Sequence, residues 1–363
     1  MNKRNETIDI ARGIAIIVMI MGHVEIGIPQ YDQLFSIWYH AWHMPIFFIV
    51  SGYFFNGRTK AAGEFISRKA KQILVPFFFW AFFNMLYELV SSGDWLMFRA
   101  TLIHSLFEKP TDGVPGAGAL WFLPAMFWLN VIYFLIVKLF DNRLVSYAVG
   151  FALGFLGMVA QARGVYLPFG IDGGLAGLPF IVTGDILRQV DVWGITALLG
   201  RKESQVHNGD KKCELENNSV VKSAGNANVM RLPWFILIPA LILFNWLFLK
   251  NGLVNFRAGE YQNYALTFVN AVAGAILLLN ISRLKLPHIL SIIGRDSLIY
   301  LCFNQRAISL VKPVLSPICG ASTIGCYTCF ALTTIVVILV CYVLHQIFAD
   351  NKFLCMAVGK QNP

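Results

Sequence analysis

The chain has 363 residues, of which 57% are hydrophobic and 13% are charged, and its mean hydropathy is +0.62. An ordinary soluble domain carries about 25% charged residues, so this composition excludes a soluble enzyme and predicts an integral membrane protein. The net charge of +9 does not indicate nucleic-acid binding, because Lys and Arg lie in short connections between apolar segments rather than on one face. We therefore expect the lipid bilayer as a partner, and no nucleic acid.

Apolar segments of about 20 residues, the length that crosses a bilayer, occur ten times along the chain. They predict an all-α, polytopic membrane protein with about ten transmembrane helices in a single membrane-embedded domain, residues 8–350 of the 363. The expected spans are 8–28, 38–55, 73–91, 120–137, 144–161, 174–190, 233–249, 264–282, 287–305 and 324–348.

The distribution of basic residues predicts the orientation of the chain. With the N-terminus inside, 20 of the 29 Lys and Arg residues fall in inner connections and 7 in outer ones, which is the asymmetry of the positive-inside rule. An even number of spans then places the C-terminus inside as well. The polar stretch 201–228 has almost nothing to bury and is expected to be a flexible cytoplasmic loop.

The first span carries three ionisable side chains, which are costly at membrane depth unless they face a cavity or a partner. Arg12 and His23 are 11 residues apart, which places them on one helix face about 16 Å apart along the axis, and Asp9 shares that face. A cation near the inner leaflet and an imidazole near the outer leaflet favour a site inside the protein. The alternative is that Asp9 and Arg12 reach the lipid headgroups and His23 only ends the helix.

The second span begins with an aromatic stretch that is rich in imidazoles. His43 is expected at a depth similar to that of His23, so the two imidazoles predict a shared site near the outer face. Pro45 lacks a backbone N–H and should bend the helix, and Gly52 permits close approach of another backbone. An aromatic belt at the membrane interface is the alternative for His40 and His43.

Several motifs carry a family resemblance. Two of them lie near the N-terminus and the others follow in order: Asp9-x-x-Arg12-Gly13 with His23 after a ten-residue spacer, Trp42-His43-Met44-Pro45-Ile46-Phe47-Phe48-Ile49-Val50-Ser51-Gly52-Tyr53, Leu120-Trp121-Phe122-Leu123-Pro124, Leu178-Pro179-Phe180 with Gly184, and Ile293-Gly294-Arg295-Asp296-Ser297-Leu298-Ile299-Tyr300-Leu301. Together they resemble the acyltransferase 3 family of multi-pass membrane O-acyltransferases, in the branch similar to fucose 4-O-acetylases.

The resemblance implies transfer of an acyl group, usually acetyl from acetyl-CoA, to a hydroxyl of a cell-surface or secreted glycan or a related acceptor. It also implies the bacterial cytoplasmic membrane as the location, and acetyl-CoA as the co-substrate. Arg12, together with Arg68 and Lys69 of the first inner connection, would bind the donor, since phosphates are natural partners of Arg and Lys. For the basic residues of that connection, the alternative is the positive-inside rule alone.

The residues at the outer end of the first two spans have the chemistry that acyl transfer requires. His23 would act as a general base that takes a proton from the acceptor hydroxyl, or would itself be acylated and relay the group. His43 would orient or polarise the reactants. Trp121 would stack against a sugar ring, or would only anchor its helix at the membrane interface. No metal is expected, because the seven cysteines show no paired CxxC pattern and no His at zinc spacing.

Two other classes of protein fit parts of the pattern. A transporter or flippase would move a polar molecule past Arg12 and His23 without chemistry, and would favour broken helices in matched halves. A regulatory or structural membrane protein would use its polar residues only to pack helices. The common face of Arg12 and His23 disfavours this last class.

Overall fold

The computed structural model describes residues 5–96, 98–99, 102–103, 114, 116–193, 233–351 and 354–360. These residues are helical apart from their connections and an isolated antiparallel bridge between Asn255 and Glu260. The predicted loop 201–228 lies outside the described residues. The helices are α1 (Glu6–Val24), α2 (Pro29–His40), α3 (Pro45–Tyr53), η1 (Gly57–Thr59), α4 (Ala62–Ser92), η3 (Gly118–Trp121), α6 (Phe122–Leu139), α7 (Arg143–Ala162), η4 (Pro168–Gly170), α8 (Ile171–Ala176), α9 (Leu178–Trp193), α12 (Trp234–Asn251), α13 (Tyr264–Ile281), α14 (His288–Arg295), α15 (Ser297–Cys319), α16 (Thr323–Asp350) and η5 (Cys355–Val358).

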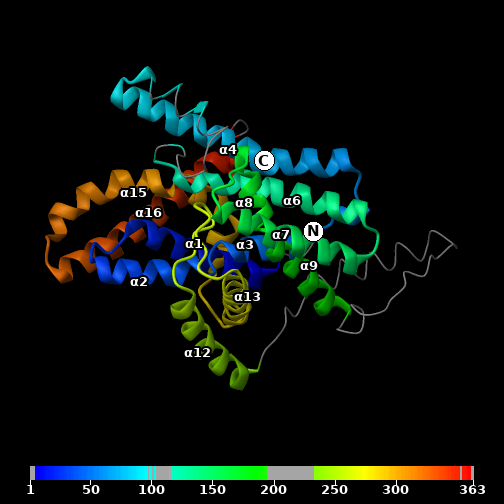
Figure 1. Cartoon of the computed structure of the whole chain (residues 1–363). Coiled ribbons are helices and arrows are strands. Elements are labelled where there is room, and N and C mark those ends of the chain that lie inside the picture. The colour runs from blue at the N-terminus through cyan, green and yellow to red at the C-terminus, as the bar shows by residue number, and fades with distance from the viewer. Residues whose placement is uncertain are drawn as a thin grey trace.

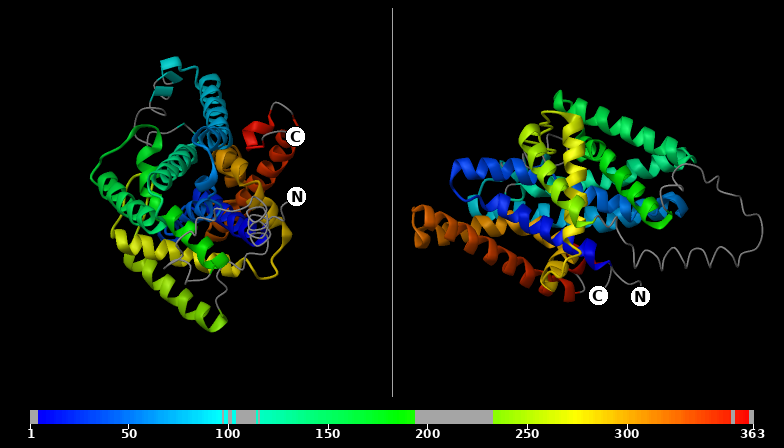
Figure 2. Two further views of the ribbon diagram at one scale, coloured as in Figure 1. Left: turned by 90° about the vertical axis from the view of Figure 1, so that its right-hand side faces the viewer. Right: turned by 90° about the horizontal axis from the view of Figure 1, so that it is seen from below.

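The helices form one bundle in which α12 packs on the outside against α13 (Figure 1). Seen from below, α13 runs across the direction of its neighbours (Figure 2). Within the described part of the chain, six helices are long and apolar enough to cross a membrane, or seven if the bent pair Pro168–Ala176 and Leu178–Val190 forms one span. The chain is therefore an all-α, multi-pass membrane protein. The number of ten spans and the orientation of the termini stay predictions.

The outward faces of the bundle are apolar, as lipid contact requires. Large exposed side chains gather on α4, α12 and α16, among them Phe78, Phe82, Val90, Ile238, Ile242, Trp246, Ile335, Leu339 and Val343. The interior instead holds many of the polar residues, including Asn84, Asn130, Gln161, Asp185, Asn270 and Asn304. Polar chemistry is thus concentrated between the helices rather than on their lipid side.

Three of the expected spans are broken among the described residues. The span 38–55 is divided into α2 and α3, because the chain leaves the helix after His40 and Pro45 opens α3 at a position where a missing N–H costs nothing. The span 174–190 is interrupted at Gly177, and the span 287–305 at Asp296. Residues 29–37 were expected to be a short connection between the first two spans. This prediction is wrong, because these residues belong to α2. The third span also starts earlier than expected, so Arg68 and Lys69 lie on α4.

Two pairs of helices cross with their backbones almost touching. Gly13 and Gly294 lie at the crossing of α1 with α14, and Gly52 and Gly184 lie at the crossing of α3 with α9. A Cβ atom on any of these four glycines would overlap a backbone carbonyl of the partner helix. Small residues permit such close packing between membrane helices. The two crossings hold α1 and α3, which carry or flank the predicted site residues, against the rest of the bundle.

Candidate active site

One face of α1 runs past two cavities in succession. Asp9, Arg12 and Ile16 line a cavity of about 610 Å³, here called the inner cavity. Met19 and His23 line a second cavity of about 150 Å³, here called the outer cavity. These residues are three or four positions apart, which is the spacing of one helix face. The structure therefore places Arg12 and His23 on one face, as the sequence predicts.

The two cavities adjoin at Leu301 of α15, which lines both. The same helix contributes Ser297 to the inner cavity and Gln305 to the outer cavity. At the junction of η3 and α6, Trp121 faces the outer cavity and the next residue, Phe122, faces the inner one. Several elements thus line both spaces, which lie one after the other along the bundle.

The inner cavity collects the three residues that the sequence predicts for donor binding. The Arg12 Nη2 atom donates to Ser297 Oγ at 2.7 Å, and Arg12 Nη1 lies 3.6 Å from Asp9 Oδ1. Arg68 and Lys69, near the start of α4, line the same cavity. The Arg12 side chain remains 27% exposed, so part of it faces the cavity. The arrangement offers basic groups to an anionic ligand.

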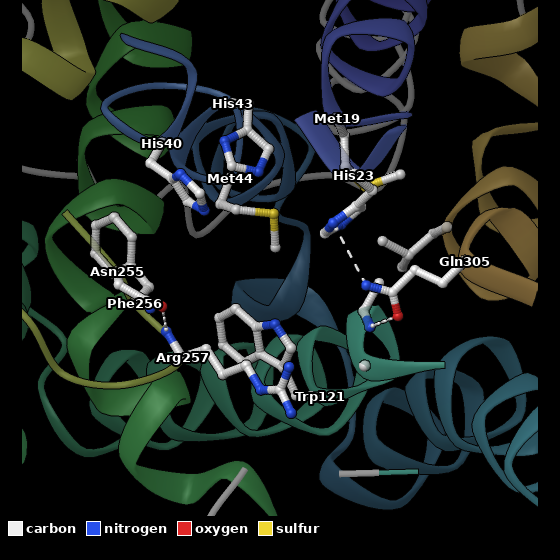
Figure 3. A pocket seen from close by; sticks show the side chains of 13 residues that line it. Met19, His23, His40, His43, Met44, Trp121, Asn255, Phe256, Arg257 and Gln305 are labelled. Atoms are coloured by element: carbon white, nitrogen blue, oxygen red, sulfur yellow. Dashed lines mark hydrogen bonds between the residues drawn. The ribbon is translucent and has the colours of Figure 1, made fainter. Parts of the chain in front are cut away.

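The outer cavity brings together His23, His43 and Trp121. In Figure 3 three imidazoles face the cavity: His23 from α1, His40 from the end of α2, and His43 from the break between α2 and α3. Trp121 and Arg257 face them from the other side of the cavity. The predicted catalytic and acceptor-binding residues therefore share one small space, although the roles assigned to them stay predictions.

Hydrogen bonds assign the proton positions of the two predicted catalytic imidazoles. His43 Nδ1 lies 2.7 Å from the carbonyl oxygen of Tyr39; a carbonyl only accepts, so Nδ1 donates and neutral His43 keeps its unshared pair on Nε2. Gln305 Oε1 accepts from the N–H of Ala119 at 3.1 Å, which turns the amide Nε2 towards His23 Nδ1 at 3.4 Å. Neutral His23 therefore accepts at Nδ1 and carries its proton on Nε2.

Sequence patterns do not identify every residue at this site. The signal for His40 is its spacing of three positions from His43, which a belt of interfacial side chains explains equally well. Gln305 follows the stretch that resembles the family motif, and Arg257 lies in an ordinary connection. Only the fold brings Arg257 to the outer cavity, because Gln161 of α7 bonds the turn between α12 and α13.

The fold and the two cavities define a helical membrane protein that offers basic groups in one cavity and imidazoles in the adjoining one. A family model described as "Acyltransferase domain", that of the acyltransferase 3 family, matches residues 5–345. The chain belongs to this family.

Curated relatives support the assignment over a shorter region. The chain is 27% identical over 154 residues to the nodulation protein NolL of Mesorhizobium japonicum, which covers 39% of this chain and 38% of the relative. It is 30% identical over 152 residues to the nodulation protein NolL of Sinorhizobium fredii, which covers 38% of this chain and 37% of the relative. The matched region thus spans less than two fifths of either relative. No solved structure matches the chain significantly.

Proposed function

We propose that the chain is a membrane O-acyltransferase that moves an acetyl group from acetyl-CoA to a hydroxyl of a cell-surface or secreted glycan. The observation that carries this proposal is the single face of α1, which presents Arg12 to the inner cavity and His23 to the outer cavity. Because Leu301 lines both cavities, a donor in one and an acceptor in the other can meet beside it. Neither molecule then has to cross the bilayer as a whole.

The donor belongs in the inner cavity. Its volume of about 610 Å³ lies within the range of about 300–1,000 Å³ that is usual for ligand pockets. Arg12, Arg68 and Lys69 would bind the phosphates of acetyl-CoA, because a guanidinium offers forked donors to a phosphate and an ammonium offers a compact charge. The positive-inside rule assigns this end of the bundle to the cytoplasm, where acetyl-CoA is made.

His23 performs the proton transfer in the outer cavity. The acceptor hydroxyl attacks the thioester carbonyl as its proton passes to His23 Nδ1, which requires the 3.4 Å contact with Gln305 to give way. The carbon–sulfur bond then breaks, and the imidazolium returns a proton to the thiolate of CoA. His43, held by its bond to the Tyr39 carbonyl, orients the reactants, and Trp121 stacks against the sugar ring.

A covalent variant uses the same residues. A ring nitrogen of His23 would attack the thioester carbonyl, the carbon–sulfur bond would break, and CoA would leave as its thiolate takes the proton of the acylated imidazolium. In a second step the acceptor hydroxyl would attack the acyl carbon, the bond to the ring nitrogen would break, and the hydroxyl proton would return to the imidazole. The two schemes differ in one observable, since only the relay forms acylated protein when no acceptor is present.

Changing Arg12 tests the donor site. We expect Arg12→Ala to raise the KM for acetyl-CoA at least about tenfold, which is the loss of one charged hydrogen-bonded contact, and Arg12→Lys to raise it less, because Lys keeps the charge but not the fork. The measurement is the initial rate of CoA release against acetyl-CoA concentration. Arg143→Ala is the matched control, since Arg143 is exposed and lines neither cavity. An unchanged KM in both Arg12 variants would remove Arg12 from the donor site.

A further inference from the structure

Two polar contacts join α1 to α15, one at each cavity. At the inner cavity Arg12 donates to Ser297 at 2.7 Å, and at the outer cavity the Gln305 amide lies 3.4 Å from His23 Nδ1. Ser297 and Gln305 are eight residues apart on α15, which places them on one face of the helix about 12 Å apart along its axis. In the proposed reaction the acyl group is handed over between these two contacts.

Three apolar side chains border the space between the two contacts. Ile16 of α1 lines the inner cavity, Met19 of α1 lines the outer cavity, and Leu301 of α15 lines both. We call these three residues the apolar neck. All three are buried and belong to one hydrophobic cluster. Leu301 lies four residues from Ser297 and four from Gln305, and among the described residues it alone lines both cavities. It therefore stands where the two cavities adjoin.

The backbone that carries Leu301 is held in place. Asn304, which is fully buried, donates through Nδ2 to the carbonyl oxygens of Tyr300 and Leu301 at 2.7 and 2.9 Å. The two neighbours of Leu301, Tyr300 and Cys302, are also buried, and α15 packs against both α1 and α16. Since the helix cannot retreat, the side chain of Leu301 sets the width of the apolar neck.

The outer cavity leaves little room beyond the neck. Its volume is about 150 Å³, and an apolar cavity of about that volume holds one benzene ring. A single sugar ring against Trp121 would therefore fill it. In a thioester the sulfur and the acyl chain diverge from the carbonyl carbon, so a chain whose sulfur stays in the inner cavity extends towards the neck. An acetyl group ends there in one methyl group, whereas a longer chain would overlap either the sugar ring or Leu301.

We propose that Leu301 restricts the donor to short acyl thioesters and so selects acetyl over longer acyl groups. The inference rests on the proposed function, because it concerns the donor of the same site. One extra methylene in an apolar pocket changes kcat/KM by about 10–200-fold. Butyryl-CoA, whose chain has two methylenes more than that of acetyl-CoA, should therefore react at least about 10²-fold less efficiently.

A comparison of donors tests the proposal. Purified protein in vesicles receives acetyl-CoA or butyryl-CoA as donor and, as acceptor, the glycan fraction isolated from cells that lack the gene. The measurement is the rate of ester formation, quantified as acetate or butyrate that alkali releases from the glycans. We expect the wild-type protein to prefer acetyl-CoA at least about 10²-fold in kcat/KM.

Substitutions assign this selectivity to one side chain. Leu301→Ala removes more carbon atoms than butyryl adds to acetyl, so the preference for acetyl-CoA should fall below about tenfold. Leu310→Ala is the matched control, because Leu310 is an exposed leucine of the same helix that lines neither cavity, and it should keep the wild-type preference. If Leu301→Ala protein does not fold, Leu301→Val with propionyl-CoA supplies the same comparison, and its preference for acetyl-CoA over propionyl-CoA should fall at least about tenfold below that of the wild type.

The outcomes separate this proposal from the proposed function. Equal use of acetyl-CoA and butyryl-CoA by the wild-type protein would overturn the proposal while leaving acyl transfer intact. A wild-type preference for acetyl-CoA that survives in folded Leu301→Ala protein, or in Leu301→Val protein with propionyl-CoA, would also overturn it. No ester formation from acetyl-CoA by the wild-type protein would contradict the proposed function, and the proposal with it.

Discussion

Replacing His23 by alanine is expected to lower acyl transfer at least ~10²-fold, the contribution that a positioned general base usually makes, while the protein inserts and purifies normally. Removing an imidazole near the end of α1 does not penalise membrane insertion, so the loss would belong to the chemistry. His43→Ala should cost less, because an orienting group assists the reaction without moving the proton. The measurement is the rate of acetyl transfer by purified protein in vesicles.

Two comparisons separate the chemical role of His23 from a general effect of losing a histidine. His288→Ala removes an exposed imidazole at the start of α14 and should retain full activity. With acetyl-CoA and no acceptor, mass spectrometry of the intact protein should detect an acetyl adduct if His23 relays the group and none if it acts as a base. Full activity in well-expressed His23→Ala protein would defeat both schemes and would assign the proton transfer to a different group.

The second large effect concerns the crossing of α3 with α9. We expect Gly184→Leu to destabilise the fold by about 3 kcal/mol or more, because a side chain there overlaps the backbone of Ile49 and neither helix can yield. The helices would have to separate, which displaces α3 and the imidazoles at its start. Thermal unfolding in detergent and the monodisperse fraction after purification measure the effect.

Gly63→Leu provides the matched control for this crossing. Gly63 also lies in a helix, α4, but a Cβ atom there would meet nothing within 4 Å. Its substitution should change the unfolding temperature little. If Gly184→Leu protein were as stable as Gly63→Leu protein, the close approach of α3 and α9 would not be part of the fold.

The first helix is the part of the site that sequence reasoning can reach. Arg12 and His23 are costly in lipid, and a simple helical period predicts that they share a face. Both the cost of these side chains in lipid and their common face depend only on one helix and the bilayer around it, so they can be inferred from local sequence. For the same reason the pattern around His43 is informative, since Pro45 marks an irregularity that the structure shows as the break between α2 and α3.

The hydrophobicity of the sequence does not reveal where the later spans are broken. Gly177 and Asp296 interrupt segments that are apolar enough to read as single spans, and the helices on either side pack against different partners. Tertiary contacts therefore decide where these helices end. Broken helices by themselves therefore do not separate a transporter from an acyltransferase, and it is the family assignment that supports the acyltransferase.

The acceptor side of the site depends on contacts between distant segments. Arg257 reaches the outer cavity because Gln161, nearly a hundred positions earlier, bonds the turn in place. No local pattern distinguishes such an arginine from an ordinary outer charge. The same holds for Gln305, whose bonds to Ala119 and His23 join three separate elements.

Transfer of an acetyl group to a surface or secreted glycan changes the mass of that glycan, which mass spectrometry measures. Glycans are released from cells that carry the intact gene, cells that lack it, and cells complemented with wild-type or His23→Ala protein. We expect loss of the gene to remove an acetyl ester from a defined glycan, the wild-type protein to restore it, and the His23→Ala protein not to restore it. Identical glycan masses in all four strains would contradict it.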